Sequence, residues 1–266
     1  MDEARSGATG CTAGVDIGAS FSKAVILSDN RMVARHIIPS GGNYRAAAET
    51  VLGAALEKAK ISRKDIRKIV ATGGGANNVS FADTISSDIA CQGRGVFFLH
   101  PFVRTIIDVG DLSSKVSRID ANGRTSAFLL SGKCAGGSAR ILQVIARVLR
   151  VKIDEIGPLS LQSLHPVRFN TQCAVFAETE AVSRVAEGLA REDLLAGIHL
   201  ALASQLYTLA ERVGMEQNCA LIGGGAKDIG LVKAVQEIAG HECVVPDEPQ
   251  MMAALGAAIV AGENVL

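Results

Sequence analysis

The chain has 266 residues, enough for two domains or one large one. Its 27 basic and 27 acidic residues balance, so neither a nucleic-acid surface nor a polyacidic tail is its main feature. Hydrophobic residues make up 48% of the chain, which excludes global disorder. Glycine is frequent at 28 residues and aromatic residues amount to only 4%, a composition that favours loops whose backbone approaches a ligand closely.

The compartment is predicted from what the sequence does not contain. No apolar run reaches the ~18 residues that a membrane span needs. Residues 1–7 lack the basic region and apolar stretch of a secretory signal. Six cysteines are too few for a disulfide framework in a chain of this size. We therefore expect a cytoplasmic protein with reduced thiols that binds neither membranes nor nucleic acid.

In chain order, a leader at residues 1–12 is followed by alternating strand and helix patterns. The first predicted strands are 14–18, 23–27, a run to Ile38, and 66–71, and the first predicted helices are 44–60 and 84–93. The strand order starts again near Val103. The later strands are 103–109, 115–119, 124–130 and 219–222, and the later helices are 135–150, 174–188, 192–213, 228–239 and one from about 250.

A motif with a conspicuous spacing marks this restart. Asp16-x-Gly18-x4-Lys23 recurs as Asp108-x-Gly110-x4-Lys115, and all three positions are displaced by 108 − 16 = 92 residues. Each copy ends one apolar strand and begins the next. A repeat on this scale indicates a duplicated α/β domain. We expect one half at 13–100 and the other at 101–249, with the helix at 250–266 packing back on the first.

The first copy of the motif has the residue types of a phosphate-binding turn. The backbone N–H groups around Gly18 can point at phosphate oxygens because no Cβ intervenes. The hydroxyls of Ser20 and Ser22 can add donors, and Lys23 can stabilise charge on a transferred phosphoryl group.

The two aspartates suggest a metal ion. Asp16 and Asp108 suit a Mg²⁺ ion that keeps most of its waters and is held through them. The alternative is structural, with both aspartates capping turns and Lys23 a solvated strand residue.

A third glycine loop, Gly223-Gly224-Gly225, follows the predicted strand 219–222 and precedes a helix. Close backbone approach to a flat nucleoside fits that position. The loop lacks the pattern of a P-loop and that of a dinucleotide fold. The alternative is an ordinary strand-to-helix turn without a ligand.

Together these residues resemble the actin, sugar kinase and heat-shock chaperone ATPase superfamily. Within it the chain is similar to ATPase activators of 2-hydroxyacyl-CoA dehydratases and ATPase subunits of benzoyl-CoA reductases. The resemblance runs from about Gly14 to Gly262, and its most specific stretches are Lys133–Ser138, Thr171–Glu178 and Ala196–His199. It implies an α/β fold of two ribonuclease-H-like, actin-like halves with a nucleotide cleft between them.

Two cysteines acquire a role through this resemblance. Cys134 and Cys173 each lie just before a predicted helix, where the macrodipole favours a thiolate. Two thiolates cannot complete the four-cysteine shell of a [4Fe–4S] cluster, whereas a two-fold dimer supplies four. The resemblance implies such a cluster, shared between two subunits. The alternative is buried, inert thiols, which we also expect for Cys91, Cys219 and Cys243, with Cys11 a stray thiol in the leader.

The activity that the resemblance implies is ATP-dependent electron activation. ATP and ADP would bind with Mg²⁺, and hydrolysis would drive a low-potential electron from the cluster to an acyl-CoA dehydratase or reductase. The electron donor would be a ferredoxin or flavodoxin, and the subunits would form a homodimer or pair with a paralogue. Two alternatives remain: a nucleotide-binding regulatory subunit with little turnover, and a small-molecule kinase of the same fold.

Two positions bear directly on hydrolysis. The related ATPases typically carry Asp-x-Gly-Gly-Gln-Asp-x-Lys in the second loop, whereas this chain has Asp111-Leu112-Ser113 after Gly110. Ser113 remains a candidate phosphate ligand, but an acidic Asp111 repels phosphate unless Mg²⁺ intervenes. The resemblance places Asp88 where related chains have a water-orienting glutamate, and the alternative is a solvated helix acid.

Three further polar residues are expected to have structural roles. Glu178 and Glu180 lie near the start of the helix after Cys173, where acidic side chains complement the dipole. His199 lies in mid-helix among apolar residues, as a satisfied core histidine does.

Overall fold

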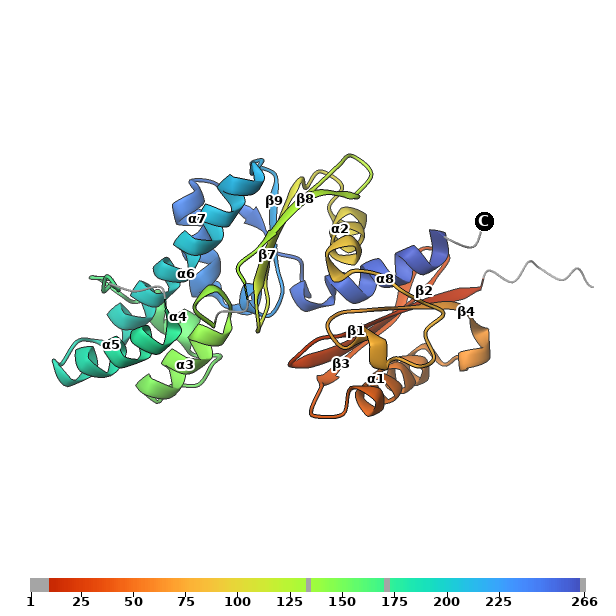
Figure 1. The fold of residues 1–266 in the computed structure, drawn as a ribbon, viewed down its shortest axis with the longest axis horizontal. Helices are drawn as coiled ribbons and strands as arrows, with labels where there is room; N and C mark the ends of the chain where they lie inside the picture. The colour runs from red at the N-terminus through yellow and green to blue at the C-terminus, as the bar shows by residue number, and fades with distance from the viewer. Residues whose placement is uncertain (1–9, 133–134, 170–172, 264–266) are drawn as a thin grey trace, which may run out of the picture. The chain divides into compact units, whose positions relative to one another are not determined.

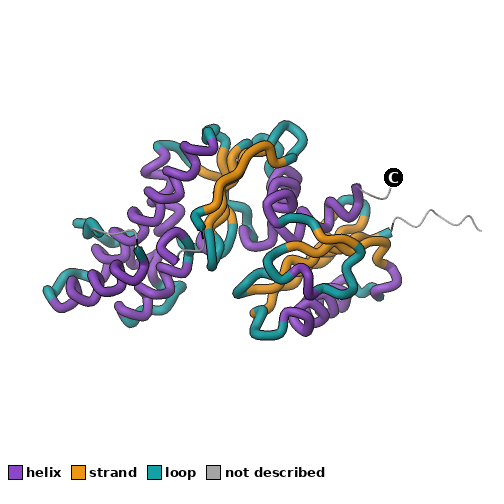
Figure 2. Tube along the Cα trace, in the orientation of Figure 1, coloured by secondary structure: helices purple, strands orange, loops and turns teal. Residues whose placement is uncertain are grey.

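The computed structural model describes residues 10–132, 135–169 and 173–263. The chain divides into two compact units, one formed by the residues up to Leu99 with the segment from Met251, and the other by His100–Gln250. Figures 1 and 2 show that each unit combines a sheet with helices. Each unit is described by itself below.

The first unit is a five-stranded mixed sheet in the order β3-β2-β1-β4-β5. Its strands are β1 (Cys11–Ile17), β2 (Phe21–Ser28), β3 (Arg31–Pro39), β4 (Ile66–Thr72) and β5 (Thr84–Ile85), and its helices are α1 (Tyr44–Ala59), α2 (Asp88–Leu99) and α8 (Met252–Glu263). Alternate residues of β1 face opposite sides, as strand geometry requires. Ala13, Val15 and Ile17 share a core with α1, whereas Thr12 donates to the carbonyl of Ala258 in α8 at 2.9 Å.

Helices α2 and α8 pack against each other at very close range. A Cβ on Gly256 would overlap the backbone of Cys91, and a Cβ on Gly95 would overlap the carbonyl of Met252. Only glycine at these positions allows the two helix backbones to approach so closely. This packing fixes α8, from the end of the chain, to the first unit.

The second unit repeats the strand arrangement, with a sheet in the order β10-β9-β6-β7-β8. Its strands are β6 (Thr105–Val109), β7 (Ser114–Ile119), β8 (Thr125–Leu130), β9 (Cys219–Ile222) and β10 (Cys243–Val244). Its helices are α3 (Arg140–Leu149), α4 (Ile156–Ser160), α5 (Ala174–Ala186), α6 (Arg191–Val213) and α7 (Ile229–Ala239). In the chain as a whole, short 3₁₀ turns lie at Arg63–Asp65, Ala76–Asn78, Ala135–Gly137, Gly225–Lys227 and Pro249–Met251.

Most of the predicted elements are confirmed, but several boundaries are wrong. The helix expected at 135–150 begins at Arg140, after a 3₁₀ turn at Ala135–Gly137. Cys11, expected in a leader, is instead the first residue of β1, where it pairs with Ile66 of β4. The helix expected from residue 84 begins at Asp88, because Thr84 and Ile85 pair with β4 as an edge strand. Three short elements, α4, β5 and β10, were not predicted, since segments of two to five residues carry too little periodicity to recognise.

The prediction of reduced thiols is wrong for one pair of cysteines. Cys219 and Cys243 are buried as expected, but they form a disulfide. They are direct partners in the parallel pairing of β9 with β10, with Cα atoms 5.0 Å apart, a separation that a disulfide spans. The pairing was missed because β10 has only two residues. No helix in the described parts of the chain has the length and apolar character to cross a membrane.

Candidate functional site

The repeated motif forms the same structure in both units. Asp16, near the end of β1, is the direct strand partner of Lys23 in β2, and Lys23 Nζ lies 2.9 Å from Asp16 Oδ2. Asp108 and Lys115 are likewise partners in β6 and β7, with their charged atoms 3.4 Å apart. Each aspartate is 6% exposed. Each unit therefore presents a nearly buried carboxylate paired with a lysine at the end of its central strand.

A glycine turn lies against each of these carboxylates. Gly73 follows β4 with a φ of 87°, and Gly223 follows β9 with a φ of 85°, both in the left-handed region that favours glycine. A Cβ on Gly73 would overlap Oδ1 of Asp16, and a Cβ on Gly223 would overlap Oδ1 of Asp108. The backbone thus passes directly beside each carboxylate, which only glycine permits.

The turn at Gly73 was not predicted as part of the site, although the sequence contains a signal for it. Gly73-Gly74-Gly75-Ala76 recurs as Gly223-Gly224-Gly225-Ala226, a displacement of 223 − 73 = 150 residues. In both copies the third glycine is buried and the second exposed. The structure therefore extends the duplication from the strand pairs to the turns that follow β4 and β9.

The serines of the first turn have different environments. Ser22 is fully buried and its hydroxyl lies 2.8 Å from that of Ser40, which in turn donates to the carbonyl of Gly18 at 2.7 Å. Ser22 therefore supports the turn from the buried side, through Ser40. This placement does not fit the predicted contact with phosphate. Ser20 is half-buried, and a Cβ on Gly18 would come within 3.0 Å of Lys23 Nζ. Glycine at this position leaves room for the lysine ammonium beside the turn.

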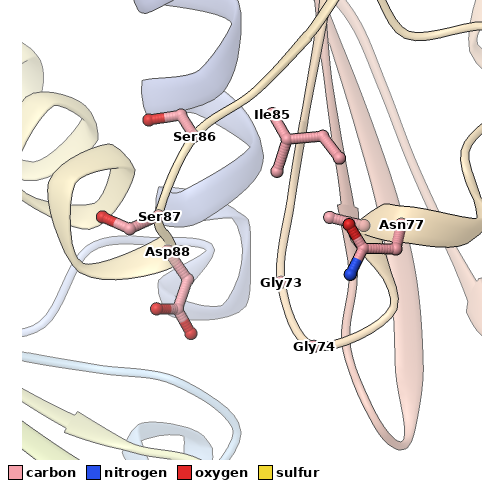
Figure 3. Close-up of a pocket in the computed structure, with 8 residues that line it drawn as sticks. Gly73, Gly74, Asn77, Ile85, Ser86, Ser87 and Asp88 are labelled. Atoms are coloured by element: carbon pink, nitrogen blue, oxygen red, sulfur yellow. The ribbon is translucent and has the colours of Figure 1, made fainter.

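Asp88 lines a pocket of about 300 Å³ in the first unit. Figure 3 shows Ser86, Ser87 and Asp88 across from the turn at Gly73 and Gly74. Because α2 begins at Asp88, the carboxylate lies at the helix end where the backbone dipole favours negative charge.

The charges of two carboxylates in the first unit, Asp16 and Asp88, influence the pKa of the buried Cys91 thiol. Burial raises the pKa of Cys91, and the negative charges of Asp16 and Asp88 raise it further, against hydrogen bonds with Ser86 and Thr72 that lower it. Asp16 and Asp88 therefore belong to one electrostatic neighbourhood at the same end of the sheet.

In the second loop, the departure from the usual pattern has a structural explanation. Asp111 Oδ2 accepts from Arg140 Nη2 at 2.5 Å, and Asp111 Oδ1 accepts from Gln143 Nε2 at 2.9 Å. In addition, the Ala139 amide donates to the Gly110 carbonyl at 2.9 Å. A cation from α3 thus compensates the acidic side chain, and three hydrogen bonds fix the loop to the start of α3. Ser113, in the same loop, is half-buried.

Of the two predicted cluster ligands, one is described. Cys173 is a half-buried cysteine at the N-cap of α5. Cys134 lies outside the described residues, in the segment just before α3. Helices α3 and α5 pack against each other, as Figure 1 shows at one end of the second unit.

The face of α5 beyond Cys173 is unusually apolar for a surface. Its large exposed residues are Val175 (68% exposed), Phe176 (66%), Val182 (54%) and Val185 (43%). The small residues Ala174, Ala177 and Ala181 face the core instead. Glu178, Thr179 and Ser183 are also exposed on this helix. Several large apolar side chains exposed on one helix are typical of an interaction surface.

The other polar predictions have mixed outcomes. Glu178 and Glu180 do not lie in the first turn of α5; Glu178 is exposed and Glu180 pairs with Arg184 at 3.3 Å, one turn further along. His199 is buried in the core as expected, with Nε2 2.9 Å from Oδ2 of Asp228, but its buried Nδ1 has no hydrogen-bond partner in the described structure. Asp228 also caps α7 through the Gly230 amide.

Comparison with known proteins gives matches over nearly the whole chain. Residues 13–261 match the BadF/BadG/BcrA/BcrD ATPase family. The 2-hydroxyisocaproyl-CoA dehydratase activator of Clostridioides difficile is 40% identical over 250 residues, covering 94% of each chain. One of the subunits of the benzoyl-CoA reductase of Thauera aromatica is 31% identical, covering 93% of this chain and 92% of that one.

Solved structures give the same result. The activator of the 2-hydroxyisocaproyl-CoA dehydratase from Clostridium difficile, solved with bound ADPNP, superposes with a TM-score of 0.90 at 40% identity, covering 95% of this chain and 94% of that one. A ROK family glucokinase from Streptomyces griseus shares only the fold, with a TM-score of 0.61 at 12% identity over 96% of this chain and 100% of that one.

These matches agree with the resemblance inferred from the motifs and support an ATP-dependent activator role. The chain belongs to the BadF/BadG/BcrA/BcrD ATPase family and is an ATPase with an actin-like fold.

Proposed function

We propose that the chain is an ATP-dependent electron activator that couples ATP hydrolysis to electron transfer from a [4Fe–4S] cluster shared by two subunits. The observation that carries the nucleotide part is the duplicated arrangement of aspartate, lysine and glycine turn. Each copy places a nearly buried carboxylate beside backbone that only glycine can form. The similarity to dehydratase activators supports the rest.

In this proposal both units contribute residues to nucleotide binding, and Asp16 and Asp108 hold a hydrated Mg²⁺ ion. The proposed phosphate-binding residues are Gly18, Ser20, Lys23, Gly110 and Ser113. The turn at Gly223, Gly224 and Gly225 accepts the nucleoside. Asp88, which lines the pocket beside Gly73, orients the attacking water.

The cluster is assigned to Cys134 and Cys173 of each of two chains. A half-buried thiol at the N-terminal end of a thirteen-residue helix suits an anionic cluster, because the helix dipole favours negative charge there. Two cysteines per chain leave the four-ligand shell incomplete, so a second chain must supply the other two. The apolar face of α5, next to Cys173, is the surface that the second chain would cover. A bound cluster supplies a one-electron carrier of low potential.

The second loop provides the connection between the two sites. Asp111, in the proposed phosphate loop, is bonded to Arg140 and Gln143 on α3, which follows Cys134. A phosphate that displaces this loop would pull on the helix that starts at the cluster. By analogy with the relatives, the acceptor is an acyl-CoA dehydratase or reductase. We propose a ferredoxin or flavodoxin as the electron donor.

An iron count on anaerobically purified protein tests the proposal. We expect four iron atoms per pair of chains together with a charge-transfer absorption that Cys173→Ser abolishes. Val182→Glu should yield monomers without iron, since a charge on the apolar face opposes pairing. Ile153→Glu is the matched control, because Ile153 is 53% exposed in the same unit and belongs to the segment between α3 and α4. Iron retained by monomers would contradict the shared cluster.

Phosphate release separates the alternatives. An activator hydrolyses ATP without an added acceptor of the phosphoryl group. Hydrolysis that depends on an added sugar or carboxylic acid would indicate a kinase instead. Nucleotide binding without measurable turnover would indicate a regulatory subunit.

A further inference from the structure

A cluster of metal-ligating side chains lies at the edge of the second sheet. Cys219 begins β9, Cys243 begins β10, and His241 precedes Cys243 by two residues. Cys219 Sγ lies 4.0 Å from His241 Nδ1. The ligand atoms of all three residues lie within 4.8 Å of one another.

These donors and their spacing suit a soft divalent cation. Thiolate sulfur binds Zn²⁺ at about 2.3 Å and imidazole nitrogen at about 2.0 Å, which places tetrahedral ligand atoms roughly 3.5–4 Å apart. The distance from Cys219 to His241 already falls at this value. The two sulfurs are bonded to each other in the structure. The distance between Cys219 Sγ and Cys243 Sγ can therefore widen to that of two zinc ligands only when the disulfide is reduced.

Burial and access also fit a metal centre. Cys219 is 1% exposed and Cys243 is 6% exposed, so a pair of thiolates here needs a compensating cation. His241 is half-buried, and β10 is the edge strand of its sheet, which leaves a route from solvent. Within the described residues this is the one group of three or more such ligands that lie this close together.

We propose that Cys219, His241 and Cys243 form a redox-controlled binding site for Zn²⁺ or a cation of the same class. In the reduced protein the two thiols lose their protons to solvent, and the thiolates and His241 Nδ1 bind the metal, with water as the fourth ligand. In the oxidised protein the disulfide excludes the metal. A dithiol reductant supplies the two electrons and two protons that convert the disulfide to two thiols, and itself becomes a disulfide.

This site is separate from the nucleotide site. Cys219 is the first residue of β9, whereas Gly223 follows its last residue. Four residues of strand separate the two positions by about 13 Å. Zinc binding should therefore respond to thiol oxidation and not to ATP.

Zinc content of the full-length protein tests the proposal. The protein is reduced with a phosphine, incubated with Zn²⁺, desalted, and analysed for metal by mass spectrometry. We expect about one zinc atom per chain in the reduced wild type and a loss of at least about tenfold after oxidation with diamide. His241→Ala and Cys243→Ser should lose zinc to a similar extent. Cys91→Ser, which removes a buried cysteine of the other unit, is the matched control and should keep it.

Two outcomes would overturn the proposal: absence of zinc from the reduced wild type, and zinc retained by Cys219→Ser/Cys243→Ser. The proposed cluster cysteines are excluded as the source by Cys134→Ser/Cys173→Ser, which should bind zinc at the wild-type level. Should Cys243→Ser fail to fold, Co²⁺ added to reduced Cys134→Ser/Cys173→Ser provides the test. Thiolate-to-cobalt charge-transfer and tetrahedral ligand-field bands support the site, and their absence contradicts it.

Discussion

At the scale of single residues, each unit places one carboxylate beside a glycine turn. Asp16 is 6% exposed and bonded to Lys23, and Asp108 has the same relation to Lys115. A nearly buried carboxylate is costly unless it is paired or binds a cation. Their equivalent placement in the two units favours a functional role over two unrelated turn caps.

Replacing Asp16 tests this directly. Asp16→Asn keeps the shape of the side chain but removes the charge proposed to hold hydrated Mg²⁺, and we expect ATP hydrolysis to fall by about 100-fold or more. Asp29→Asn is the matched control, since Asp29 is exposed in a turn with a φ of 51° that asparagine also tolerates. Steady-state phosphate release measures both variants. Equal rates in wild type and Asp16→Asn would remove Asp16 from the mechanism.

The contact between Asp111 and Arg140 makes a second prediction. Arg140→Gln removes the cation that compensates Asp111 beside the proposed phosphate site, so we expect the KM for MgATP to rise about threefold to tenfold. Adding Asp111→Asn to Arg140→Gln should restore the wild-type KM. Arg147→Gln, on an exposed position of the same helix, should leave it unchanged. An unaltered KM in Arg140→Gln would show that Asp111 is compensated in another way.

At the scale of elements, the close packing of α2 on α8 holds α8 in the first unit. Gly256→Ala places a methyl group against the Cys91 backbone, which cannot move aside without shifting a helix. We expect a loss of about 1–3 kcal/mol in the free energy of unfolding. Gly262→Ala, on the same helix with open space around it, should cause no loss. Thermal or denaturant unfolding compares them, and equal stabilities would mean that the helices separate readily.

The segment that contains Ser163 and His165 is fixed to α6 by Asp193. Hydrogen bonds from the Ser163 hydroxyl and then the His165 amide lower the pKa of Asp193 below its usual value. The folded protein therefore binds this proton less readily than the unfolded chain, and the contribution to stability is present above about pH 4 and lost as the pH falls further. In Asp193→Asn, the free energy of unfolding should fall less as the pH is lowered. If the free energy of unfolding depends on pH in the same way in wild type and Asp193→Asn between pH 5 and pH 3, this role is contradicted.

Most elements could be predicted from sequence, including the four-residue β9, but α4, β5 and β10 could not. Strand β9 and helix α7 were recognisable because an apolar run ends at a glycine turn and a helical pattern follows. By contrast, β10 has two residues and no periodicity, and it is the element that brings Cys243 opposite Cys219. The contact between Asp111 and Arg140 joins residues 29 positions apart, which only the fold brings together.

At the scale of the whole molecule, the duplication accounts for the architecture. Both sheets have the same strand order, and two sequence repeats, displaced by 92 and by 150 residues, supply the same turn and carboxylate in each unit. The different displacements arise because α3 to α6 lie between β8 and β9 in the second unit, whereas α1 alone fills the corresponding interval in the first. Those additional helices include the one that begins at Cys173.

If the nucleotide state controls the cluster, as proposed, the rate at which a chelator removes iron should depend on the bound nucleotide. In anaerobically purified wild-type protein, we expect a non-hydrolysable ATP analogue with Mg²⁺ to change the rate of iron release by at least about tenfold relative to MgADP. In Asp16→Asn the two rates should be equal. Equal rates in the wild type, at saturating nucleotide, would contradict the coupling of ATP to the cluster.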